Sequence, residues 1–149
     1  NPSLVGSEMC IRDSYMSLAF YRKYPNRVSS LLIIDTGPGF KNDDAREGWN
    51  KYAIKSAEKY ESRNLQGIGN AARGMLTQKD DRIIKSLPDI LVPTLVIVGE
   101  NDKPFLSAAD YMNNKIKNSK KNIIPDAGHA VNIEQPELFN SAVLEFLKT

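Results

Sequence analysis

The side chain best suited to proton transfer is that of His129, the only histidine among the 149 residues. It follows a short apolar stretch, residues 122–124, and comes directly after Gly128. Asp102 has a similar position, just beyond the apolar run of residues 94–98. A carboxylate that accepts a hydrogen bond from Nδ1–H of a histidine leaves Nε2 as the proton acceptor. We therefore predict that Asp102 orients His129 as a general base, with an oxygen roughly 2.6–3.2 Å from Nδ1.

The sequence leaves other assignments of these residues open. Glu100 lies at the same predicted strand end as Asp102, and Asp35 follows an earlier apolar run. Either carboxylate could take the place of Asp102 beside the histidine. Asp35 is also typical of a turn, because glycines follow it at positions 37 and 39. A lone histidine is often structural, but a position just after a strand and a glycine favours a role in catalysis.

Three apolar runs predict the strands that carry these residues. Residues 28–34, 94–98 and 122–124 have the composition of strands buried on both faces. Segments with helical periodicity separate them, so the order is that of an α/β protein whose parallel strands are neighbours in one sheet. Residues 117–121 are expected to form a solvated basic turn. In such sheets chemistry occurs beyond the carboxyl ends of the strands, where both candidate residues fall.

Residues 41–87 are predicted to form a helical insert between the first two strands. Asp43 or Asp44 is expected to cap its first helix. Residues 67–69 contain two glycines, but the third glycine of a phosphate-binding loop is missing and no strand precedes them. They are interpreted as a linker before a short helix at residues 70–76.

Length and composition exclude several classes of protein. The net charge of +2 comes from interspersed lysines, so neither nucleic acid nor a membrane is expected as a partner. No apolar run approaches the roughly 20 residues that span a bilayer. The single cysteine, Cys10, excludes an internal disulfide and favours a reducing compartment such as the cytoplasm, although the sequence leaves the location open. No cofactor or bound metal is expected, and the oligomeric state is unknown.

Together the motifs resemble the C-terminal half of an α/β-hydrolase. The resemblance rests on the central strand followed by Gly-Glu-Asn-Asp-Lys-Pro-Phe and, downstream, on Ile-Ile-Pro-Asp-Ala-Gly-His-Ala-Val-Asn. The acid precedes the histidine, as it does in that family. The resemblance implies a partial α/β-hydrolase fold, with Asp102 as the acid and His129 as the catalytic histidine. It also implies that residues 41–87 form a helical cap over the substrate pocket, and that residues 1–149 are one incomplete domain.

One motif of that family is missing. The nucleophile of an α/β-hydrolase lies in a Gly-x-Ser-x-Gly elbow, and the chain contains no such motif. Residues 1–14 are atypical, and residues 7–14 resemble a translated sequencing-adapter remnant. One interpretation is an artefact in which the elbow and the strands before it were lost. Ser7, Cys10 and Ser14 are close by, but they lack the glycine-flanked turn that exposes a nucleophile. The nucleophile is therefore unknown.

The resemblance implies a hydrolase that acts on an ester, lactone or thioester of a small, partly apolar molecule. An epoxide hydrolase or dehalogenase with an aspartate nucleophile is an alternative within the same fold. A non-catalytic small-molecule receptor is an alternative from another class. Because the nucleophile is absent, the chain as it stands is expected to be inactive and, through an unpaired sheet edge, prone to aggregation.

Overall fold

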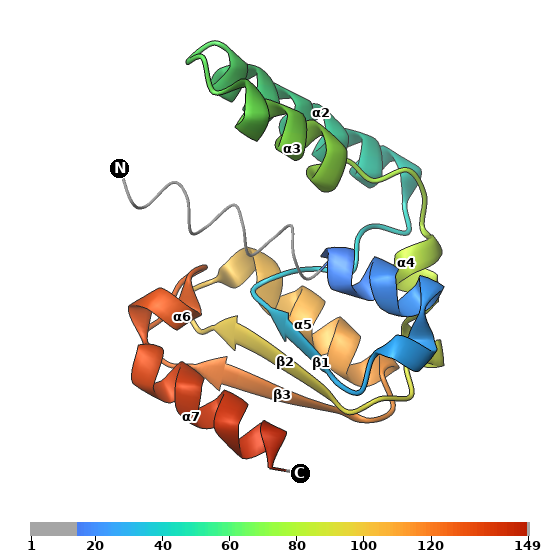
Figure 1. Ribbon diagram of the computed structural model, residues 1–149, viewed down its shortest axis with the longest axis vertical. Coiled ribbons are helices and arrows are strands. Elements are labelled where there is room, and N and C mark those ends of the chain that lie inside the picture. The colour runs from blue at the N-terminus through green and yellow to red at the C-terminus, as the bar shows by residue number, and fades with distance from the viewer. Residues whose placement is uncertain (1–14, 149) are drawn as a thin grey trace. The chain divides into compact units, whose positions relative to one another are not determined.

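The computed structural model describes residues 15–148 of the chain. These residues form two compact units. The first unit contains the residues up to Pro38 and those from Ser86 onward, and the second contains Gly39–Lys85 (Figure 1). In the described part of the chain, no helix is both long and apolar enough to cross a membrane.

A parallel sheet of three strands forms the centre of the first unit. Its order is β1 (Leu31–Ile34), β2 (Thr94–Gly99) and β3 (Ser119–Ile124). All six residues of β2 are buried, because this strand has a neighbour on each side and helices pack against the sheet. The predicted α/β class and the parallel, adjacent placement of the three strands are confirmed.

Both outer strands differ from the prediction in where they begin. β1 begins at Leu31 and not at residue 28, because a 3-10 turn, η1 (Pro25–Arg27), precedes it and delays entry into the sheet. β3 begins at Ser119, so the prediction of a basic turn over residues 117–121 is wrong for residues 119–121. Backbone pairing with β2 extends this strand, and its lysines are tolerated because β3 is an outer strand in the described sheet.

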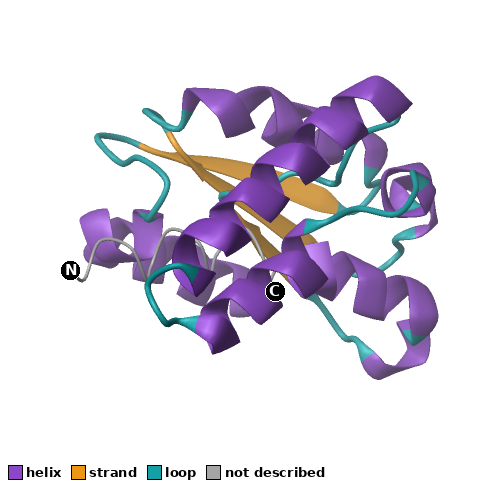
Figure 2. Cartoon of the chain, turned by 90° about the horizontal axis from the view of Figure 1, so that it is seen from above, coloured by secondary structure: helices purple, strands orange, loops and turns teal. Residues whose placement is uncertain are grey.

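Helices flank the sheet of the first unit (Figure 2). One covers residues 15–23, and the others are α5 (Lys103–Lys115), α6 (Val131–Glu134) and α7 (Pro136–Leu147), with a 3-10 turn η2 (Leu87–Asp89) before β2. The apolar core joins β2 to the last two helices, where Leu95 and Ile97 cluster with Val131 and Phe146. This packing holds the loops after β2 and β3 against one another.

The second unit consists of three helices, α2 (Asp43–Glu61), α3 (Gln66–Leu76) and α4 (Arg82–Lys85). Residues 67–69 lie inside α3, so their interpretation as a linker is wrong. The physical reason is the contact with α2: a Cβ atom on Gly69 would lie 2.5 Å from Cγ of Glu61 and 3.1 Å from the carbonyl oxygen of Ala57. Packing between the helices therefore requires a residue without a side chain and outweighs the low helix propensity of glycine.

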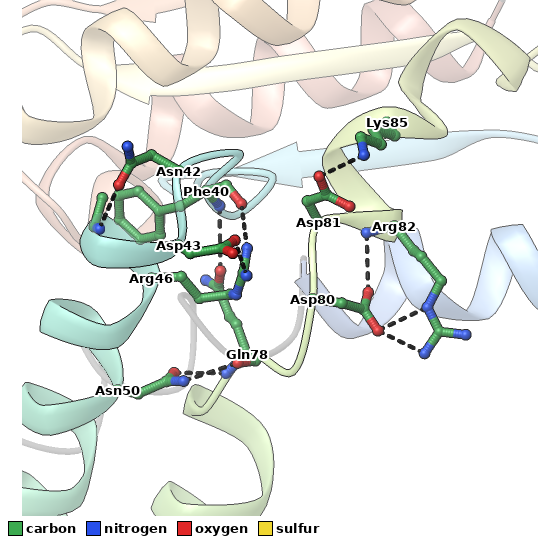
Figure 3. Close-up of polar contacts among 11 residues, drawn as sticks. Phe40, Asn42, Asp43, Arg46, Asn50, Gln78, Asp80, Asp81, Arg82 and Lys85 are labelled. Atoms are coloured by element: carbon green, nitrogen blue, oxygen red, sulfur yellow. Dashed lines mark hydrogen bonds and ion pairs between the residues drawn. The ribbon is translucent and has the colours of Figure 1, made fainter.

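Hydrogen bonds from polar side chains stabilise the second unit (Figure 3). Asn42 caps α2 by accepting a hydrogen bond from the N–H of Ala45, so neither Asp43 nor Asp44 is the cap. Asn50 on α2 binds the backbone of Gln78 twice: its Nδ2 donates to the carbonyl oxygen at 2.8 Å and its Oδ1 accepts from the N–H at 2.7 Å. This compact unit overlaps the predicted insert, residues 41–87. Its role as a cap stays a prediction.

Asn50→Ala should destabilise the second unit by about 2 kcal/mol, because the substitution leaves two backbone groups of the buried Gln78 without their partner. Trp49, the only tryptophan in the chain, donates to the carbonyl oxygen of Leu76 and so reports on this unit. Urea unfolding followed by tryptophan fluorescence measures the effect. The control is Asn70→Ala at an exposed position of α3, which should change stability by less than about 0.5 kcal/mol. Equal unfolding midpoints for the two variants would contradict the prediction.

Candidate active site

Asp102 and His129 meet beyond the carboxyl ends of β2 and β3. Asp102 occupies the N-cap position of α5, yet its side chain makes no capping hydrogen bond. Its Oδ2 instead lies 2.7 Å from Nδ1 of His129. The carboxylate is only 6% exposed, which strengthens an interaction that water would otherwise weaken. The distance falls within the predicted range, and the structure brings together the two residues that the sequence singled out.

Backbone contacts hold the loops that carry these two residues. The N–H of Glu100 donates to the carbonyl oxygen of Ile124 at 2.9 Å, and the N–H of Asn101 donates to the carbonyl oxygen of Ala127 at 2.8 Å. The two backbone segments approach each other so closely that a Cβ atom on Gly99 would lie 2.1 Å from the carbonyl oxygen of Gly128. Gly99 is therefore required by this close approach.

The two rival carboxylates have other partners. Glu100 is exposed, and its Oε2 accepts a hydrogen bond from the N–H of Asp126 at 3.2 Å. Asp35 is fully buried and has a left-handed backbone conformation, with φ of 44°. Its Oδ1 accepts from the N–H of Gly99 at 3.0 Å and its Oδ2 from the N–H of Val131 at 3.2 Å. Neither residue takes the place of Asp102 beside Nδ1 of the histidine.

Burial shapes the electrostatics of Asp35. Removal from water raises the pKa of its carboxyl group from 3.8 to about 6, and the nearby charge of Asp102 acts in the same direction. The N–H groups of Gly99 and Val131 lower the pKa, as does His129, but they do not cancel the effect of burial. A buried acid thus lies within electrostatic range of the Asp102–His129 pair.

Two further side chains orient the imidazole. The ring of Phe105 packs against that of His129, with centroids 4.9 Å apart and an angle of 31° between the planes. Glu134 accepts from the N–H groups on both sides of the histidine, with Oε2 2.7 Å from the nitrogen of Gly128 and Oε1 3.1 Å from that of Ala130. The sequence reasoning missed Glu134. An acidic residue that reaches back to the start of a short helix is the signal that could have found it.

Residues 15–148, as the structure describes them, do not identify a nucleophile. Ser7, Cys10 and Ser14, the hydroxyl and thiol groups weighed in the sequence, lie outside the described residues. Nε2 of His129, the ring nitrogen that a nucleophile would approach, is a buried atom. The described residues therefore provide a buried carboxylate and an imidazole in hydrogen-bond contact.

Comparison with known proteins points to one family. The sequence model described as "alpha/beta hydrolase fold" matches residues 44–136, which is more than half of the chain. A Bacillus subtilis protein, whose name refers to 2-succinyl-6-hydroxy-2,4-cyclohexadiene-1-carboxylate synthase, is 29% identical over 97% of this chain. A 3-oxoadipate enol-lactonase of Acinetobacter baylyi is 32% identical over 74% of it. The chain spans only 65% and 38% of the lengths of these two relatives.

A solved structure extends the comparison to three dimensions. A thermophilic esterase from Thermogutta terrifontis matches 91% of this chain and 61% of its own, with 26% sequence identity and a TM-score of 0.64. The partial fold expected from the sequence is thus the fold observed. The names of the matched proteins refer to more than one kind of reaction, so the family by itself does not determine the substrate.

Gly99→Ala should lower the free energy of unfolding of the first unit by about 2 kcal/mol or more, because the new methyl group would overlap backbone atoms of Ala127 and Gly128. The matched control is Gly37→Ala, where the nearest atom to an added Cβ is Cβ of Ala108 at 3.5 Å, an ordinary contact. Urea unfolding followed by the Hε1 resonance of His129, the only histidine, measures both variants in the same unit. A Gly99→Ala protein as stable as the control would refute the close approach.

The contribution of Asp35 to stability should depend on pH. The folded protein keeps a proton on this carboxyl group up to about pH 6, whereas an unfolded chain releases it near pH 3.8. The folded state therefore binds more protons in this interval, and stability is lost as the pH rises through it. The free energy of unfolding of the unmodified protein, minus that of Asp35→Asn, should fall between pH 3.8 and 6 and then level off. Urea titrations at pH 4, 5, 6 and 7 measure this difference, and a constant or rising value would contradict the raised pKa.

Proposed function

Because the chain belongs to the α/β-hydrolase family, we propose that Asp102 and His129 are the acid and the base of a Ser-Asp-His triad. The proposed reaction is hydrolysis of an ester, lactone or thioester of a small, partly apolar molecule. The observation that carries the proposal is the 2.7 Å contact between Oδ2 of the buried Asp102 and Nδ1 of His129. This contact fixes the tautomer in which Nε2 accepts a proton.

The proposed mechanism follows from that tautomer. Nε2 of His129 takes the proton from a serine hydroxyl as its oxygen attacks the carbonyl carbon of the substrate. The negative charge of Asp102 stabilises the imidazolium that forms. The imidazolium then protonates the leaving alcohol or thiol, and an acyl-enzyme remains. Water attacks this ester with Nε2 again as the base, which releases the acid product and restores the serine.

The packing around His129 supports a base that does not change orientation between these steps. Phe105 lies against the ring, and Glu134 binds the backbone N–H groups on either side of it. A preorganised base avoids the cost of reorientation during proton transfer. The names of two matched proteins, an enol-lactonase and an esterase, support acyl transfer to water as the reaction class.

The proposed serine belongs to a Gly-x-Ser-x-Gly elbow, and the sequence contains no such motif. We therefore expect the chain as it stands to leave short-chain aryl esters intact. A chain in which an α/β-hydrolase N-terminal half with such an elbow precedes Tyr15 should hydrolyse them. In that chain, His129→Ala or Asp102→Asn should reduce kcat/KM by about 10⁴-fold, because the base is lost or its tautomer is wrong.

Steady-state assays with the completed chain and both variants test the proposal. Asp110→Asn is the control, because this exposed carboxylate on α5 pairs with Lys121 and lies outside the site. It should retain full activity. Hydrolysis that survives in the His129→Ala variant would refute the role of the histidine. A completed chain that binds small esters without turning them over would favour a receptor.

A further inference from the structure

Asp35 joins the two segments that carry the Asp102–His129 pair. Its Oδ1 accepts from the N–H of Gly99, three residues before Asp102, and its Oδ2 accepts from the N–H of Val131, two residues after His129. Both bonds are buried. The two oxygens of one carboxylate therefore connect residues 99–102, here called the acid loop, to residues 125–131, here called the histidine loop. Asp35 does so from a third strand end, that of β1.

A turn residue alone would not need these features. Asp35 is fully buried, and its φ of 44° is a conformation that non-glycine residues seldom adopt. An asparagine or a glycine would form the same left-handed turn without burying a carboxylate. Burial of this group is costly, as its raised pKa of about 6 reflects. Two acceptor oxygens on one side chain are what a carboxylate provides and an amide does not.

We propose that Asp35 is a positioning residue that ties the acid loop to the histidine loop and thereby maintains the hydrogen bond between Asp102 and His129. The role rests on the proposed function, in which His129 transfers the proton and Asp102 stabilises the imidazolium. Asp35 acts in two ways. Its hydrogen bonds set the separation of the loops. Its negative charge, which faces the charges of Asp102 and His129, stabilises the protonated imidazole.

Nuclear magnetic resonance of the single histidine tests the proposal on the chain as it exists, without turnover. In the unmodified protein the Nδ1 proton of His129 should give a low-field resonance, because it is held by Asp102. Asp35→Asn preserves size but removes the charge and one acceptor. The pKa of His129 should then fall by about 0.5 or more, and the Nδ1 proton resonance should broaden through exchange with water. Asp110→Asn, which removes one exposed negative charge from α5, should change neither quantity.

A merely structural role would lower the unfolding temperature of Asp35→Asn and leave the histidine unchanged. A folded variant with the same His129 pKa and the same Nδ1 resonance as the unmodified protein therefore overturns the proposal.

If the Asp35→Asn variant does not fold, a titration of the unmodified protein still tests the proposal. The amide resonances of Gly99 and Val131 should titrate together with the Asp35 carboxyl carbon, with a midpoint near pH 6. Amide chemical shifts of Gly99 and Val131 that stay constant while the Asp35 carboxyl carbon titrates would also overturn the proposal. Failure of the proposed function is a separate result, seen as absent hydrolysis in the elbow-completed chain while the changes at the histidine are still observed.

Discussion

The first unit depends on the close approach of two backbone segments, at Gly99 and at the loop that ends in His129. A Cβ atom on Gly99 would lie 2.1 Å from one carbonyl oxygen and 2.4 Å from the next, so no side chain can be present there. The segment that follows β2 packs against the segment that follows β3. A hydrogen bond from the N–H of Asn101 to the carbonyl oxygen of Ala127 joins the two segments. Asp102 and His129 lie on either side of this junction. Their 2.7 Å contact is thus a consequence of backbone packing as well as of their own attraction.

Two buried carboxylates, those of Asp35 and Asp102, are the second constraint on this unit, and different groups compensate their loss of hydration. Asp102 is compensated by the histidine, whereas Asp35 is compensated by two backbone N–H groups. The contrast fits two different tasks. A carboxylate that must stabilise a forming imidazolium needs contact with the ring, while one that positions the backbone needs two fixed donors. Glu134 is exposed and bonds to the N–H groups beside His129 from the surface. One carboxylate therefore contacts the imidazole itself, and two others bind the backbone of the segments around it.

The second unit is organised by specific polar contacts as much as by apolar packing. α2 and α3 approach closely at Gly69, and beside this contact Arg73 binds both carboxylate oxygens of Glu61 at 2.8 and 2.9 Å. The double hydrogen bond between Asn50 and Gln78 then fixes the chain that follows α3. Such contacts join residues that are distant in the sequence and leave no periodic pattern. The sequence therefore predicted helices in this region but not where they begin, and it mistook residues 67–69 for a linker.

What the sequence determined by itself was the class of fold, the central strand and the sheet edge at which an acid would meet the histidine. A continuous apolar run such as residues 94–98 is compatible with little other than a strand buried on both faces, and residues just beyond parallel strands must meet at one sheet edge. Only the tertiary structure decided which acid contacts the histidine, because Asp35, Glu100 and Asp102 are equivalent as residue types after a strand. Burial and the direction of backbone N–H groups separate them. Both depend on segments as far apart as Asp35 and Val131, 96 residues away, and no local pattern encodes such a distance.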